Sequence, residues 1–579
     1  MTKIEQTLKQ NFGYNEFRLY QKNVIESVLE NKSSLAVFPT GAGKSLCFQL
    51  PAILMESLTL VVSPLIALMK DQVDALKKKG INAERLDSTL SLDDYQNLIQ
   101  SIKENKIKIL YVSPERFNNE IFRNFFHQIP ISLFVIDEAH CISEWGHNFR
   151  PDYLKLPIYA KEFGAKTLLA LTATAKQKVQ QDICDSLSIK KEHAFISGFY
   201  RENLNLLFSV FNDKDHQKND LINKINSRET GSTIIYVTLQ KTAEDLSNEL
   251  NQNGISSQAY HAGMDNEERK NIQEWFIESN EAIIVSTIAF GMGIDKSNIR
   301  YVYHYNLPKS LESYSQEIGR SGRDNKTSYC EVFANAEDIN ILENFIYGDM
   351  PNYDDITQFI SYVFSFENLI QLKLITLSRE YDIKVNVIKT ILTHLELKGF
   401  IKSKAPIYTE YKFIPLKSSK EILELIPDSD KYLVTIIFKN IIKRTKYFDV
   451  NLDHLINTFN LSRIDIINTL NMLNDLNMID LTVKGLLHEY HYVNKSKNID
   501  IVSKEIYDFL KIREAAELNR ISNVINLINS NECQSKLLSN YFGEILEKNC
   551  GKCSYCLSNK KLNLTRNHIS TSWRPTATT

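Results

Sequence analysis

The chain has 579 residues, 43% of them hydrophobic and 24% charged, with a formal net charge of −2. This length exceeds one hydrophobic core, and the near-neutral charge excludes a protein that attracts nucleic acid through its overall field, although a local basic groove remains compatible. No apolar run reaches about 18 residues and the first residues lack the apolar core of a signal peptide, so we expect a cytoplasmic protein with no membrane segment.

Short apolar runs that end in polar, Gly or Pro residues follow one another along the first 205 residues. Buried parallel strands have this appearance, and ligands bind at their carboxyl ends. We therefore predict an α/β lobe over residues 1–205. Its predicted strands lie within SSLAVFP (33–39), LTLVVSP (58–64), IKILYVSP (107–114), ISLFVIDEAH (131–140) and AKTLLALTAT (165–174).

The first of these runs leads into FPTGAGKS, residues 38–45. Its backbone N–H groups can wrap a phosphate at a helix N-terminus, Lys44 can reach the β and γ phosphates, and the Ser45 hydroxyl can ligate Mg²⁺. Phe38 occupies the first glycine position of the full P-loop pattern, so the segment alone could also be a chance Gly-rich turn. The nucleotide-binding residues predicted here are Thr40, Gly41, Ala42, Gly43, Lys44 and Ser45.

A pair of carboxylates ends the fourth run. Asp137 can hold the magnesium shell, and Glu138 can activate water for in-line attack on the γ-phosphate. A solvated acidic pair has no reason to follow a buried strand directly. The two motifs together predict a Mg²⁺-dependent NTPase.

The same strand pattern recurs over residues 206–345, which we predict to be a second α/β lobe. Arg320 and Arg323, three residues apart, would share one helical face and could stabilise charge on the transferred phosphoryl group. Two surface arginines in ion pairs are the alternative. Both arginines could point into the cleft between the two lobes. Gly291 and Asp295 lie in a loop that precedes the arginines in the chain and could line the same cleft. The predicted strands lie within STIIYVT (232–238), SSQAYHAG (256–263), EAIIVST (281–287) and IRYVYHYNLP (299–308).

Residues 346–500 have a helical character and contain a weak internal repeat. The segments from Asp382 and from Asn460 align without gaps, so that Ile388 matches Ile466 and Leu392 matches Leu470. Each segment predicts a turn, an amphipathic helix and the start of a strand, as in a winged helix. Two helical hairpins with only a scaffolding role are the alternative.

Four of the eight cysteines cluster near the C-terminus, at Cys533, Cys550, Cys553 and Cys556. In a reducing cytoplasm such a cluster indicates metal rather than disulfides, and four thiolates suit structural Zn²⁺. The C-x-x-C-x-x-C spacing also occurs in iron–sulfur ligation, but the fourth cysteine of the bacterial ferredoxin run is missing here. Free thiols are the third alternative.

These motifs, in this order, resemble the RecQ family of superfamily 2 DNA helicases over about residues 10–340 and 515–557. The resemblance implies two RecA-like lobes and a small helical zinc-binding module. The segment FGYNEFRLYQ resembles the family's adenine-recognition motif, in which Tyr14 would stack on the base and Arg18 and Gln21 would contact its edge. The other similar motifs are VVSPLIALMKDQ, YVSPER, ALTATA, IIYVTLQKTAEDL, AYHAGM, STIAFGMGIDK and QEIGRSGRD.

The segment after Glu138, HCISEWGHNFRPDY, resembles the aromatic-rich loop of RecQ helicases, which couples DNA contact to the ATP site. Trp145 and Phe149 offer faces on which bases can stack, and Arg150 can contact phosphate. Because the loop is continuous with the catalytic carboxylates, a DNA-induced shift would reach the water that they position. An aromatic plug buried between the lobes is the alternative.

One feature departs from the family layout. Some 150 residues separate the second lobe from the zinc module, which we place at residues 501–560, and a tail at 561–579 follows it. The inserted region at residues 346–500 could supply the winged-helix function from this altered position. No strand-separating hairpin can be placed by resemblance.

The sequence thus predicts an ATP-dependent DNA helicase with Mg²⁺ and Zn²⁺ as cofactors. The resemblance implies 3′ to 5′ movement on single-stranded and forked DNA in replication, recombination and repair, a monomer at the nucleoid, and a single-strand-binding protein or a topoisomerase as protein partners. The alternatives are an RNA helicase, a translocase that does not unwind and an ATP-gated DNA-binding scaffold.

Overall fold

A computed structural model describes residues 2–64, 66–86, 92–143, 146, 149–291, 296–494 and 498–566. The predicted site residues Trp145 and Asp295 and most of the predicted tail lie outside these ranges. Within them, no helix is both long enough and apolar enough to cross a membrane.

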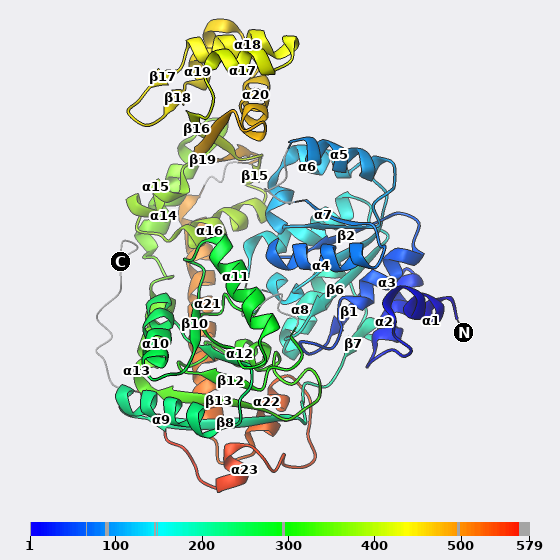
Figure 1. The fold of residues 1–579 in the computed structure, drawn as a ribbon, viewed down its shortest axis with the longest axis vertical. Helices are drawn as coiled ribbons and strands as arrows, with labels where there is room; N and C mark the ends of the chain where they lie inside the picture. Colours follow the sequence, from blue (N-terminus) through cyan, green and yellow to red (C-terminus); the bar gives the residue numbers. More distant parts are fainter. Residues whose placement is uncertain are drawn as a thin grey trace.

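The first lobe is a parallel sheet in the order β3-β4-β2-β5-β6-β1-β7 (Figure 1). All five predicted runs form strands, and these occupy the buried middle of the sheet. The two strands that were not predicted, β3 and β7, lie at the sheet edges and have partly exposed side chains; β3 contains two charged residues, and β7 is only three residues long. The strands are β1 (Ser34–Val37), β2 (Leu58–Val62), β3 (Ala83–Leu86), β4 (Ile109–Val112), β5 (Ile131–Ile136), β6 (Thr167–Thr172) and β7 (Ala194–Ile196).

Successive side chains of this sheet enter two separate cores. Leu35 and Val37 of β1 pack into one core and Ala36 into the other, as expected when both faces of a sheet are covered by helices. The sheet is therefore rigid, and its carboxyl edge can hold side chains in fixed positions. The helices are α1 (Lys3–Thr7), α2 (Gln21–Leu29), α3 (Leu46–Leu54), α4 (Ile66–Lys78), α5 (Leu92–Lys103), α6 (Glu120–Phe126), α7 (Leu156–Glu162) and α8 (Gln177–Leu187), with short helical turns η1 (Leu8–Phe12), η2 (Pro114–Asn118), η3 (Ala139–Ile142), η4 (Pro151–Lys155) and η5 (Lys191–His193).

The second lobe is also a parallel sheet, in the order β10-β11-β9-β12-β13-β8. The four predicted runs form β9, β10, β11 and β12, of which β10 lies at an edge of the sheet, whereas β8 and the interior strand β13 were not predicted. Strand β8 crosses residue 205 and pairs along its whole length with β13, so the second sheet begins at Leu204. The strands are β8 (Leu204–Phe211), β9 (Thr233–Tyr236), β10 (Ser257–Tyr260), β11 (Ile283–Ser286), β12 (Tyr301–His304) and β13 (Ser328–Asn335), and the helices are α9 (Lys214–Ser227), α10 (Gln240–Gln252), α11 (Asn266–Glu278), α12 (Leu311–Ile318) and α13 (Ala336–Tyr347).

Both copies of the predicted repeat form a turn, a helix and the start of a strand, as predicted, and a further helix precedes each copy. The aligned positions Ile388 and Ile466, and Leu392 and Leu470, are all fully buried, which explains why they are apolar in both copies. Helix α14 and strand β14 precede the first copy, which gives it the element order of a winged helix. The elements are α14 (Tyr353–Ser365), β14 (Leu369–Leu372), α15 (Leu374–Glu380), α16 (Val385–Leu397) and β15 (Ile401–Ser403), followed by α17 (Ser419–Leu425), α18 (Asp428–Lys439), β17 (Ile442–Lys443), β18 (Phe448–Val450), α19 (Leu452–Phe459) and α20 (Arg463–Asp475).

The second unit is nested inside the first. Strand β19 (Ile479–Tyr492) pairs through its C-terminal half with β14 and β15, and through its N-terminal half with β16 (Ile407–Pro415). The ribbon of β16 and β19 is therefore the wing of the first unit, and residues 416–478 are inserted at its tip, where Pro415 pairs with Ile479. In Figure 1 this second unit (yellow) lies at the far end of the molecule from the zinc module (red).

Helix α21 (Ile499–Ile528) connects the inserted region to α22 (Gln534–Tyr541) and α23 (Ser554–Ser558) and runs alongside the second lobe (Figure 1). Its N-terminal part, including Val502 and Ile506, belongs to the core of the first winged-helix unit. Its C-terminal part, including Ile521 and Val524, shares a core with the second lobe and the cysteine module. The helix is thus common to both regions, and our predicted boundary at residue 500 divides a continuous packing unit.

Candidate functional site

The predicted phosphate loop and the carboxylates follow two strands of the first sheet that are separated by one strand. The loop follows β1, Asp137 follows β5, and β6 lies between these strands. Tyr153 donates a hydrogen bond to the Asp137 carbonyl at 3.1 Å, and the Asp137 carboxylate accepts one from Ser63, after β2, at 3.3 Å. Parallel strand order therefore brings both motifs to one edge.

The carboxylates lie in a charged network. Desolvation and the adjacent Glu138 raise the pKa of Asp137 to about 7. Desolvation would also raise the pKa of Glu138, but the charges around it lower this pKa below its ordinary value. They belong to His140, whose Nδ1 lies 3.3 Å from the Glu138 carboxylate, and to Lys44 and Arg320. Glu138 also has a left-handed backbone (φ 49°), a conformation that costs free energy in residues other than glycine and is frequent at functional sites.

Lys44 faces the same carboxylates. Its ammonium donates hydrogen bonds to the carbonyls of Phe38 at 3.2 Å and Pro39 at 3.5 Å. Desolvation lowers its pKa, and Glu138 and Asp137 oppose that shift. Ser45 and Asp137 line one cleft, and hydroxyl and carboxylate oxygens are ligands that Mg²⁺ accepts, so these residues fit the predicted magnesium site.

The second lobe presents both predicted arginines to the phosphate loop. A Cβ added to Gly41, whose φ is +83°, would lie 3.1 Å from Cγ of Arg323. Arg320 is buried, donates a hydrogen bond to the Gly291 carbonyl, and has an Nε–H with no hydrogen-bond partner among the described residues. The lobes also touch where Gln316 donates to Thr174 at 3.0 Å. Both arginines line the cleft.

The predicted adenine motif lies beside this loop. Tyr14 is 50% exposed and lines the cleft together with Arg18. Gln21 is buried, and its Nε2 donates to the carbonyls of Ala42 at 3.2 Å and Gly43 at 3.0 Å. In this conformation Gln21 therefore holds the phosphate loop, which differs from the predicted contact with an adenine edge.

One cleft of about 1570 Å³ joins the nucleotide residues to the aromatic-rich loop, the helix α16 and the helix α21. Phe149 and Arg150 line it. The guanidinium of Arg513, on α21, lies 4.4 Å from the centre of the Phe149 ring. One face of this aromatic ring is thus covered by a cation, a contact that sequence reasoning missed.

The inserted region is anchored to the first lobe directly after the aromatic-rich loop. Lys155, at the end of η4, forms a 2.6 Å ion pair with Glu396 of α16, and both side chains are largely buried. Glu396 also accepts hydrogen bonds from the backbone and side chain of Ser403. No local pattern in the sequence indicates this pair, because its members are 241 residues apart.

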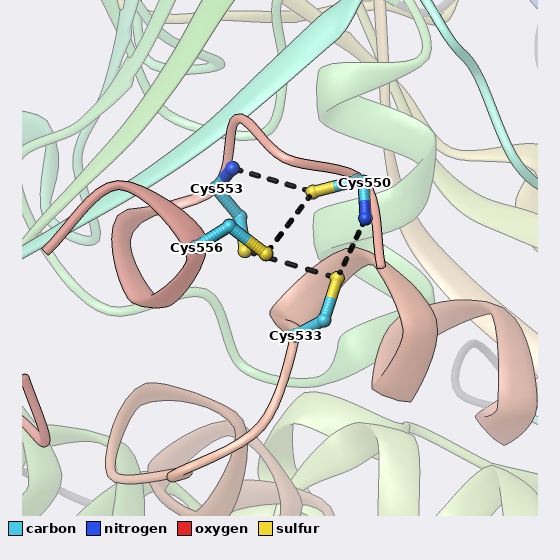
Figure 2. A group of neighbouring side chains, drawn as sticks. All are labelled: Cys533, Cys550, Cys553 and Cys556. Atoms are coloured by element: carbon cyan, nitrogen blue, oxygen red, sulfur yellow. Dashed lines mark hydrogen bonds between the residues drawn. The ribbon is translucent and has the colours of Figure 1, made fainter. Parts of the chain in front are cut away.

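The four clustered cysteines converge as predicted (Figure 2). Their Sγ atoms lie within 4.8 Å of one another, with 3.9 Å between Cys553 and Cys533 and 4.0 Å between Cys550 and Cys556. Tetrahedral Zn²⁺ with Zn–S bonds of about 2.3 Å places its sulfurs about 3.8 Å apart. Hydrogen bonding from Cys553 lowers the pKa of the Cys550 thiol to about 4, which favours the thiolate that a metal needs. The cluster therefore fits structural zinc.

We expect Cys550→Ser to lower the zinc content from about one ion per chain and to destabilise the second lobe, because Cys533 and Cys553 belong to its core. Metal analysis and thermal unfolding measure the two effects. The matched control is Cys184→Ser, in a buried cysteine of the first lobe, which should keep its zinc. Absorbance near 400 nm in the purified protein would indicate an iron–sulfur cluster instead.

Comparison with known proteins covers both lobes and the cysteine module. Residues 18–183 match the family described as DEAD/DEAH box helicase, residues 216–325 match the helicase conserved C-terminal domain, and residues 499–557 match RecQ zinc-binding. These matches flank the inserted region on both sides.

Curated relatives are similar over more than half of the chain. The ATP-dependent DNA helicase RecQ of Bacillus subtilis is 42% identical over 346 residues, 59% of this chain and 58% of the relative. The probable ATP-dependent DNA helicase RecS of the same organism is 41% identical over 364 residues, 62% of this chain and 72% of the relative. The chain spans 50–58% of the length of the RecQ helicases of B. subtilis, Haemophilus influenzae and Pasteurella multocida. By this likeness across both lobes and the zinc module, the chain belongs to the RecQ family of DNA helicases.

Proposed function

We propose that the chain is an ATP-dependent DNA helicase that moves 3′ to 5′ along single-stranded DNA and unwinds forked or partial duplexes. The observation that carries this proposal is the single cleft lined by the phosphate loop, the lobe-two arginines and Phe149 and Arg150 of the aromatic-rich loop. The relatives named ATP-dependent DNA helicase support the choice of DNA. Such an enzyme would act at the nucleoid, as a monomer, in replication, recombination and repair.

The residues have distinct proposed roles in hydrolysis. Lys44 neutralises the β and γ phosphates, and Glu138 accepts the proton of the attacking water. Ser45 and Asp137 would hold Mg²⁺, which supplies further charge neutralisation. Arg320 and Arg323 approach the γ-phosphate from the second lobe, so hydrolysis depends on the distance between the lobes.

Coupling to DNA follows from the position of the aromatic-rich loop. Its Phe149 and Arg150, together with Trp145, are the proposed contacts with single-stranded DNA. Tyr153, the last residue of this loop, donates a hydrogen bond to the Asp137 carbonyl, so a movement of the loop has a short covalent and hydrogen-bonded route to the carboxylates. DNA in the cleft would thereby change the rate at which water is activated.

The test combines ATP hydrolysis with strand separation. We expect single-stranded DNA to stimulate ATPase activity more than RNA does, and a duplex with a 3′ tail to be unwound in preference to one with a 5′ tail. Stimulation without unwinding would favour the translocase. DNA binding without hydrolysis would favour the ATP-gated scaffold, and stronger stimulation by RNA would favour the RNA helicase.

We further propose that the nested unit contacts duplex DNA. Because Pro415 and Ile479 are paired across the ribbon, residues 416–478 can be replaced by an Asn-Gly turn that closes the hairpin. We expect this variant to keep its DNA-stimulated ATPase activity and its zinc, and to bind forks about tenfold more weakly than the intact chain. Fluorescence anisotropy with forked and single-stranded DNA measures the difference.

Two outcomes separate a binding unit from a spacer. Equal fork affinity in the deletion variant would make the nested unit a spacer. A narrower variant, Lys443→Ala with Lys446→Ala, removes two cations at the β17–β18 hairpin and should reduce the salt dependence of fork binding. Arg444 is left in place because it already pairs with Asp449 at 2.8 Å.

A further inference from the structure

The linker between the two lobes is held by a carboxylate from the zinc module. This linker, residues 197–203, lies between β7 and β8. The backbone N–H groups of Phe199 and Tyr200 both donate to one carboxylate oxygen of Glu544, at 2.5 and 2.7 Å. The Phe542 ring stacks on the Phe199 ring with centroids 4.6 Å apart and an interplanar angle of 17°. Two consecutive backbone donors and one side chain of the linker are therefore satisfied by a segment 345 residues away.

The same short segment touches both lobes. Tyr541 donates a 2.8 Å hydrogen bond to Glu312 on α12 of the second lobe. Gly543 lies against Gln177 of α8 in the first lobe, where an added Cβ would be 3.2 Å from Nε2. Lys552 also donates to the carbonyl of Glu202 in the linker. Residues 541–544 thus meet the first lobe, the linker and the second lobe at one place.

This place adjoins the catalytic arginines. Arg201, the next linker residue, donates to the carbonyls of Ser321 at 3.2 Å and Gly322 at 2.8 Å, which lie between Arg320 and Arg323 in the chain. The linker also bounds a small cavity of about 40 Å³. The first lobe contributes Thr40 and Thr174 to its lining, the second lobe Gly319, and the cysteine module Ser539 and Phe542. The conformation of the linker therefore affects the position of residues 320–323, which carry both arginines, relative to the phosphate loop.

We propose that Glu544 is a positioning residue that fixes the inter-lobe linker in the conformation in which Arg320 and Arg323 face the nucleotide. Hydrogen bonds to a carboxylate are stronger than neutral ones, and two of them restrict the backbone torsions of residues 199 and 200. Helix α22 begins after Cys533 and ends at Tyr541. It therefore connects the cysteine cluster to Glu544 and sets the position of this carboxylate. This role rests on the proposed ATPase function, because the quantity that it controls is the closure of the lobes.

The variants are Glu544→Ala, which removes both hydrogen bonds, and Glu544→Gln, which keeps an oxygen able to accept them but loses the charge. Glu547→Ala, in an exposed neighbour, is the matched control. We expect the DNA-stimulated kcat to fall about tenfold in Glu544→Ala and less in Glu544→Gln, with the affinity for a non-hydrolysable ATP analogue within about twofold of the parent, because the phosphate loop and Tyr14 belong to the first lobe. Zinc content and thermal unfolding should match the control.

A second measurement reads the linker directly. Lys161 and Lys241 are exposed positions on the first and second lobes. Spin labels carried there by unnatural amino acids report the distance between the lobes by double electron–electron resonance, and the cysteines remain unlabelled. The distribution should broaden in Glu544→Ala. An unchanged distribution with unchanged kcat would overturn the proposal, and so would a fall in kcat that follows zinc loss or unfolding. If the intact chain proved not to be an ATPase, the distance measurement would still test the contact.

Discussion

Replacing Glu138 by Gln is expected to lower ATP hydrolysis by about 10²–10⁴-fold, with or without DNA, while ATP still binds. Glutamine has nearly the same shape but cannot accept the proton of the attacking water. Lys44 and the phosphate loop are unchanged, so the substrate contacts persist. Single-turnover hydrolysis and binding of a fluorescent ATP analogue measure the two quantities separately.

Two further variants make this result specific. Lys44→Ala should lose nucleotide affinity as well as hydrolysis, because phosphate charge is no longer neutralised. Asp71→Asn, in an acidic residue of helix α4, controls for a general change in charge. Hydrolysis at the parent rate in Glu138→Gln would show that another group activates the water.

Phe149→Ala is expected to leave basal ATPase activity near that of the parent and to remove most of its stimulation by single-stranded DNA. The phosphate, magnesium and arginine contacts are untouched, whereas loss of one stacking face costs about 1–3 kcal/mol per base. Trp145→Ala should behave alike, and Arg150→Ala should also make DNA binding less dependent on salt. Tyr329→Ala, in a 41% exposed aromatic residue of the second lobe that does not line the cleft, is the control.

Saturating DNA separates binding from coupling. If it restores full stimulation in Phe149→Ala, the loop is only a binding surface and the coupling role is wrong. The Arg513 contact adds a second comparison. If Arg513→Ala reproduces the defect of Phe149→Ala at saturating DNA, the ring acts through α21, whereas a defect confined to Phe149→Ala assigns the effect to the aromatic face itself.

Most of the interior strands and the nucleotide motifs were predictable because their signals are local, whereas the interior strand β13 was missed. A buried parallel strand is a continuous apolar run; Asp137 and Glu138 follow such a run directly, and the loop that carries Lys44 and Ser45 begins at the end of another. The repeat was detectable for the same reason, since its buried positions Ile388 and Ile466 recur at equal spacing.

The contacts that join the domains could not be predicted in this way. Lys155 and Glu396 form an ion pair only because α16 packs on η4, and Glu544 reaches Phe199 only after the zinc module docks. In the sequence each is an ordinary charged residue. The nesting of the second winged-helix unit was also hidden, because the two halves of the ribbon are separated by residues 416–478.

The shared helix α21 sets an order of events during synthesis of the chain on the ribosome. The first lobe is complete once β7 has emerged, but the core of the second lobe includes Ile521, about 180 residues beyond Leu342. At typical elongation rates the second lobe waits roughly 10 to 35 s for this part of its core. During that interval the apolar side of its sheet lacks its final cover, so the nascent chain is most exposed to chaperones and to aggregation just before α21 leaves the exit tunnel.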